Sequence, residues 1–140
     1  DSAPRVDGGE RLLLSQWEQR IGVTMRFMIM VFGERAELHA KPTEWIERMV
    51  AFMVRLDDEL AQSGELVYSE VLEGADAATL VPQHGATSRG SFNVSDAPLS
   101  RYWVVKVPDE SRAVEIAASV AEVVDAAVEV RQCMEQSLRP

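Results

Sequence analysis

Ionisable side chains beside expected strands are the residues of this chain best suited to chemistry. Asp96 lies in a turn just before an apolar run, where a carboxylate partly withdrawn from water is a candidate general base. Arg131 follows Glu129 by two positions in a strand-like segment, and its forked N–H donors suit a substrate carboxylate. Each has a competing structural interpretation: Asp96 stabilises its turn, and Arg131 forms an ion pair with Glu129.

A second group of candidates supplies the walls of a binding site. Tyr68 and Glu70 alternate on an expected strand and therefore share one of its faces. Trp45, Tyr68 and Trp103 are candidate aromatic walls, whereas Asp96, Glu70 and Arg131 are candidate polar contacts. We expect them to surround a small organic molecule in a cleft between helices and sheet.

Metal and nucleotide chemistry have little support in the sequence. The two histidines, His39 and His84, lie in expected loops, and the single Cys133 leaves no cysteine and histidine spacing typical of zinc. The glycines form no phosphate-binding motif and no nucleophile elbow is present, so we expect neither a metal nor a cofactor.

The apolar periodicity predicts one domain at residues 25–134, between an extension at 1–24 and a tail at 135–140. We expect a short amphipathic helix in the extension. Expected elements of the domain are strands at 27–32, 66–72, 102–107 and 128–133, helices at 42–63 and from Asp109, and a hairpin of strands at 78–81 and 90–94. This order is typical of an α+β, ferredoxin-like fold: a split βαβ antiparallel sheet with two helices on one face.

Segments 27–32 and 102–107 are apolar on both faces, yet two helices cover only one face of such a sheet. An exposed apolar face of that size is uncommon in a monomer, so we expect a second copy to cover it in a symmetric homodimer. The helix in the N-terminal extension is the rival cover.

Several segments resemble the YCII-related family, in particular its DGPF branch: residues 25–33 and 64–72, the turn Asp96-Ala97-Pro98-Leu99 and the closing Glu129-Val130-Arg131. The resemblance covers about residues 25–133 and implies a dimeric α+β barrel. Ala97 and Leu99 depart from the family turn Asp-Gly-Pro-Phe, and only Ser100 and Arg101 separate the turn from the expected strand. The His-Asp pair proposed for the YCII branch is absent in its usual form, because Glu44 stands where its histidine would be.

Two functions are compatible with this resemblance. In the first, the domain binds a small organic molecule and carries out isomerase, lyase or cofactor-free oxygenase chemistry. In the second, it is a non-catalytic accessory or regulatory homodimer that acts through protein interaction.

Charge and composition restrict the kinds of binding partner that we expect. The 140 residues carry a net charge of −9 without a basic cluster, so we expect no binding to nucleic acid. No apolar run is long enough to span a membrane, and a single cysteine is compatible with a reducing compartment. We therefore expect a cytoplasmic protein with no membrane partner.

Overall fold

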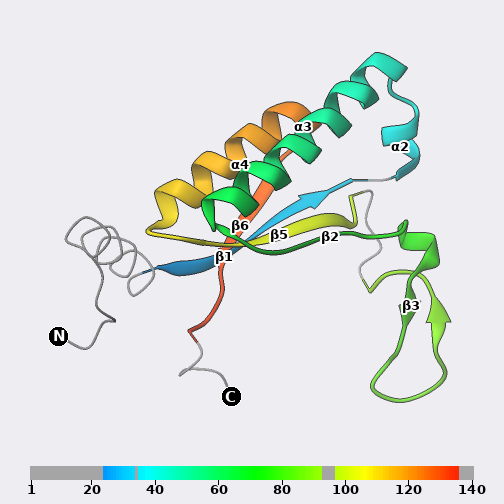
Figure 1. Ribbon diagram of the computed structural model, residues 1–140. Coiled ribbons are helices and arrows are strands. Elements are labelled where there is room, and N and C mark those ends of the chain that lie inside the picture. Colours follow the sequence, from blue (N-terminus) through cyan, green and yellow to red (C-terminus); the bar gives the residue numbers. More distant parts are fainter. Residues whose placement is uncertain (1–23, 34, 93–96, 136–140) are drawn as a thin grey trace, which may run out of the picture.

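A four-stranded antiparallel sheet with helices on one face forms the body of the protein (Figure 1). The computed structural model describes residues 24–33, 35–92 and 97–135. The main elements are β1 (Met25–Phe32), α2 (Arg35–His39), α3 (Thr43–Ser63), β2 (Leu66–Val71), β5 (Leu99–Val107), α4 (Glu110–Val124) and β6 (Val128–Gln132). Between β2 and β5 lie η1 (Ala75–Ala77), β3 (Thr79–Leu80) and β4 (Ser88–Arg89).

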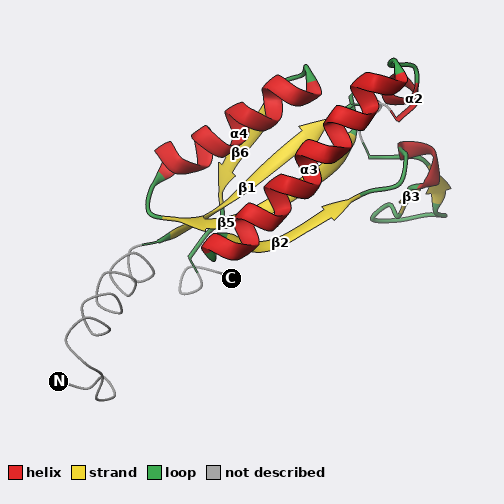
Figure 2. Ribbon diagram, turned by 45° about the horizontal axis from the view of Figure 1, so that its top comes forward, coloured by secondary structure: helices red, strands yellow, loops and turns green. Residues whose placement is uncertain are grey.

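The sheet order β2-β5-β1-β6 contains two split βαβ units. β1 and β2 are parallel with β5 between them, and β5 and β6 are parallel with β1 between them, because every neighbouring pair is antiparallel. α3 and α4 connect the two pairs and lie on the same face of the sheet (Figures 1 and 2). The predicted α+β class is confirmed, and the topology is compatible with a ferredoxin-like fold.

The core lies between the sheet and these two helices. Alternate residues of β1 and β5 point into it, as the period of a strand requires. Its buried members are Phe27, Ile29, Val31, Met53, Leu56, Leu60, Trp103, Val105, Val107, Ala113, Ile116, Ala117 and Val120. The apolar stripe predicted on the long helix is therefore the packing face of α3.

The ends of both long helices follow local sequence signals. Gly64 ends α3 in the left-handed conformation, with φ of 80°, where a side chain would be unfavourable. Asp109 caps α4 by accepting a hydrogen bond from the Arg112 backbone N–H at 3.1 Å. The helix predicted from Asp109 is confirmed, with Asp109 as its N-cap.

The predicted hairpin is present, but its second strand was placed too late. It pairs β3 with β4 at Ser88–Arg89 instead of residues 90–94. Gly90 has φ of 124°, outside the range of a regular strand, and so ends the pairing. The short α2 was not predicted, and His39 lies at its end.

Two predictions fall on residues outside the described part of the chain: the amphipathic helix of the N-terminal extension, and Asp96 with its candidate catalytic and turn-stabilising roles. Among the helices that the structure describes, none is long and apolar enough to cross a membrane.

Candidate functional site

The two faces of the sheet place the candidate residues on opposite sides. Side chains of directly paired strand residues point to the same face. Tyr68 pairs with Val104 and Glu70 with Tyr102, whereas Trp103 and Val105 alternate with them and point into the helix-covered core. Tyr68 and Glu70 share one face, as predicted, and it is the face away from the helices.

Arg131 lies on this same face. It pairs with Met28, and Glu129 pairs with Met30, both of which alternate with the core residues of β1. We call this surface the open face: Met28, Met30, Tyr68, Glu70, Tyr102, Val104, Glu129 and Arg131. None of the helices at residues 24–33, 35–92 or 97–135 covers it (Figures 1 and 2).

Neighbouring side chains satisfy the polar candidates of the open face. The Tyr68 hydroxyl donates a hydrogen bond to Glu70, and this bond raises the pKa of Tyr68. The Tyr68 ring also contacts Tyr102, with ring centroids 6.3 Å apart. Arg131 is 73% exposed and donates to Glu129, with Nε at 2.8 Å from Oε2, so the ion-pair interpretation is the one observed.

A different cluster lies on the helix side of the sheet. Trp103 is fully buried, and its indole Nε1 donates to Asp57 Oδ1 at 2.7 Å. Arg101 approaches the same carboxylate, with NH2 at 3.3 Å from Oδ2, and its guanidinium lies 4.8 Å from the centre of the Trp103 ring. Asp57, Arg101 and Trp103 thus form one polar cluster between α3 and β5.

The hydrogen bonding of Arg101 is incomplete. Its side chain is 19% exposed, and burial lowers its pKa while the Asp57 carboxylate opposes that shift. The Nε atom is shielded from solvent and finds no acceptor in the part of the chain that the structure describes. A buried donor without a partner is costly, so this atom is the least satisfied polar group of the cluster.

Among the residues that the structure describes, the predicted site residues do not converge on one cleft. Tyr68, Glu70 and Arg131 point away from the helices, so their expected position in a cleft between helices and sheet is wrong. Trp103 lies on the expected side of the sheet, between helices and strands, where it is fully buried in the core. Trp45 lies near the start of α3, half-buried, with the Lys41 ammonium 5.1 Å from its ring centre.

Asp57 and Arg101 are the residues that the sequence interpretation missed. Asp57 follows Met53 by four residues, which places it beside the buried stripe of α3. Arg101 precedes Trp103 by two residues and so shares its face of β5. The four-residue spacing on α3 and the two-residue spacing on β5 together could have predicted that this charged pair faces the core.

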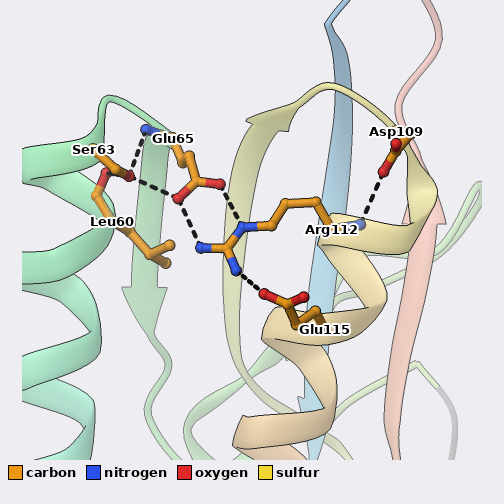
Figure 3. A network of polar contacts seen from close by, with 6 residues as sticks. All are labelled: Leu60, Ser63, Glu65, Asp109, Arg112 and Glu115. Atoms are coloured by element: carbon orange, nitrogen blue, oxygen red, sulfur yellow. Dashed lines mark hydrogen bonds and ion pairs between the residues drawn. The ribbon is translucent and has the colours of Figure 1, made fainter.

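A second polar network connects the end of α3 with the start of α4 (Figure 3). Arg112 donates from Nε and NH2 to both oxygens of Glu65, at 2.7 and 2.9 Å, and also pairs with Glu115. Ser63 Oγ lies 2.7 Å from Glu65 Oε1. These bonds hold the pKa of Glu65 below its ordinary value, with Arg112 as the largest cause, and raise that of Arg112.

Within the described residues, no group of three or more histidine, cysteine, aspartate or glutamate side chains is arranged to hold a metal ion. No protein-family model matches the chain, and no curated protein is significantly similar to it. The open face and the Asp57, Arg101 and Trp103 cluster are therefore the two candidate functional surfaces of the described residues.

Proposed function

We propose that the chain is a YCII-related domain that works as a symmetric homodimer, an interaction module joined through its open face. The observation that carries this proposal is the apolar centre of that face. Met28 and Met30 on β1 lie beside Val104 and Tyr102 on β5, on a side without a described helix. A sheet with two apolar faces needs a cover on each.

The arrangement of polar groups supports a protein partner. Apolar side chains occupy the two central strands, whereas Glu70, Glu129 and Arg131 lie on the edge strands β2 and β6. An apolar centre with a polar rim is the usual anatomy of a protein interface. Sheet-to-sheet packing of two copies would produce the dimeric α+β barrel that the family resemblance implies.

Charge along the strands supports a second copy as that partner. Arg26 pairs with Lys106 at one end of the face, while Glu70 and Glu129 flank the Tyr102 and Met30 pair nearer the other end. A two-fold axis lying across the strands would set the basic end of one copy against the acidic end of the other. The face is therefore complementary to itself.

A second candidate function is the binding of a small organic molecule on the helix side, with isomerase, lyase or oxygenase chemistry as the classes that the resemblance implies. The observation favouring it is the half-buried cation of Arg101, whose hydrogen bonding is incomplete. A cytoplasmic setting, compatible with a single cysteine, belongs to both candidates.

Native mass spectrometry of the purified chain tests both candidate functions in one experiment. The homodimer predicts a principal species of twice 15.5 kDa. The second candidate predicts additional small-molecule mass retained on part of the protein. A protein that is monomeric at micromolar concentration contradicts the first candidate, and ligand-free protein that binds nothing from a metabolite library contradicts the second.

A further inference from the structure

Asp57 divides its two oxygens between two different donors. Oδ1 accepts the indole N–H of Trp103 at 2.7 Å, and Oδ2 receives the longer contact of 3.3 Å from Arg101 NH2. The short bond fixes the carboxylate on the tryptophan. The Arg101 guanidinium therefore donates only one long hydrogen bond, from NH2 to Oδ2 of Asp57, and its Nε–H has no acceptor in the described part of the chain.

Arg112 shows what a fully engaged arginine looks like in the same protein. Its Nε and NH2 point to the two oxygens of Glu65 at 2.7 and 2.9 Å, the side-on bidentate geometry (Figure 3). Arg101 has the same pair of donors, but Asp57 contacts only one of them. A second carboxylate would be needed for Arg101 to form the bidentate ion pair that Arg112 forms with Glu65.

Exposed apolar side chains flank the cluster. Val54 precedes Asp57 by three residues on α3, and Val71 pairs with Arg101 across β2 and β5, on the same face. Both valines are 58% exposed, and Val50, one turn before Val54, is half exposed. α3 packs against β2, so these residues border one surface, which we call the Arg101 surface: Val50, Val54, Asp57, Val71 and Arg101.

We propose that the Arg101 surface binds a small monocarboxylate with an apolar body. The carboxylate accepts from Nε and NH2 of Arg101, replaces the long contact from Asp57, and leaves the Asp57 bond to Trp103 in place. The apolar body covers Val54 and Val71. This proposal rests on the second candidate function and is independent of the dimer.

Two properties of the cluster shape the binding. The cation–π contact with the Trp103 ring helps to hold the guanidinium in position, and a shift of this group must accompany binding because Nε is shielded in the free protein. The charge of Asp57 opposes an incoming anion, which keeps the affinity modest. Removing that charge while keeping an oxygen acceptor for Trp103 should therefore strengthen binding.

The test is a titration with hexanoate, followed by ¹H–¹⁵N NMR at the Arg101 Nε–H and the Trp103 indole N–H. We expect saturable shifts at both groups with millimolar affinity, and none with 1-hexanol, which has the apolar body without the charge. The substitution R101K keeps a positive charge but loses the fork, and should weaken binding about tenfold. D57N should tighten binding about threefold.

R131M is the matched control, because it removes an arginine from the opposite face of the same sheet. Hexanoate binding that is unchanged in R131M and weakened in R101K supports the proposal. Absence of saturable shifts, equal response to hexanol, or equal loss in both variants overturns it. If circular dichroism shows that R101K is unfolded, the comparison of D57N with wild type decides alone. Weaker hexanoate binding by D57N than by wild type then overturns the proposal. A non-acidic molecule found by native mass spectrometry with a negative hexanoate titration would overturn this inference but not the second candidate function.

Discussion

The two faces of the sheet are built from alternate residues of the same strands, yet they differ in what completes them. On one face, α3 and α4 cover Phe27, Ile29 and Trp103, and the layer closes within the chain. On the other, Met28 and Val104 have no described helix above them. β1 and β5 are therefore each suited to two apolar layers, of which the residues that the structure describes supply one.

Adjacent residues of β1 give the sharpest test of this difference. Ile29 is fully buried against the helices, so I29D should unfold the protein, at a cost of about 4 kcal/mol or more for an unpaired buried charge. M28D, one residue earlier and on the open face, should leave the far-ultraviolet circular dichroism native, because Met28 is only partly buried. Urea titrations of the two variants measure the contrast. Equal destabilisation would show that both faces are closed within one chain.

Loss of Asp57 should be the next largest effect on stability. D57A leaves the buried Trp103 N–H and the half-buried Arg101 charge without their shared acceptor. Because Asp57 is itself a third exposed, we expect about 2 to 3 kcal/mol of destabilisation, whereas D57N should recover much of it by accepting from Trp103. Thermal and urea unfolding would check the order. Equal stability of D57A and wild type would mean that the cluster contributes nothing to folding.

The Glu65 and Arg112 pair predicts a smaller effect that depends on pH. The folded pKa of Glu65 is below its ordinary value of 4.5, so its stabilisation is present above that pH and is lost as pH falls through the folded value. We expect E65Q to lower the free energy of unfolding by about 1 kcal/mol at neutral pH. This is less than a fully buried ion pair would lose, because Arg112 is partly exposed to solvent.

The difference between E65Q and wild type should shrink as the pH falls below 4.5 and through the folded pKa of Glu65, because the protonated carboxyl is then as uncharged as the amide that replaces it. Unfolding free energies across pH 3 to 7 measure it. A difference that is constant with pH would refute the assigned role of the carboxylate charge.

Charge complementarity of the open face predicts the smallest effect. K106E removes a cation from the basic end and should weaken self-association by roughly 0.5 to 1 kcal/mol. Adding E70K should restore part of it if the basic end meets the acidic end across a two-fold axis. Dilution isotherms of the single and double variants provide the test. Additive losses would exclude this orientation.

The sequence predicted the elements whose pattern burial dictates. The apolar residues of α3 recur at the period of a helix, so they lie on one face of it. Those of β1 and β5 form uninterrupted runs that are typical of a strand with two apolar faces. The shared face of Tyr68 and Glu70 followed from the same period. Which face this is depends on the pairing of β2 with β5 and its irregularity between Leu66 and Tyr68, and no local pattern specifies that.

The polar cluster escaped prediction for a different reason. Charged residues on α3 are typical of a solvent-facing surface, and most of them are exposed, so Asp57 resembled its neighbours in the sequence. Its partner Trp103 is 46 residues away, on β5. Only tertiary packing brings the indole N–H to that carboxylate and makes Arg101 share it.

Sedimentation velocity of wild type beside V104D tests whether a second copy covers the open face. Val104 lies on the open face between Tyr68 and Met28, so its replacement by Asp buries a charge only if a second copy covers it. V114D, at an exposed position of α4, is the control. At the same micromolar concentration we expect wild type and V114D to be dimers and V104D to be a folded monomer. A wild-type monomer with native circular dichroism, or a V104D dimer as tight as wild type, would contradict it.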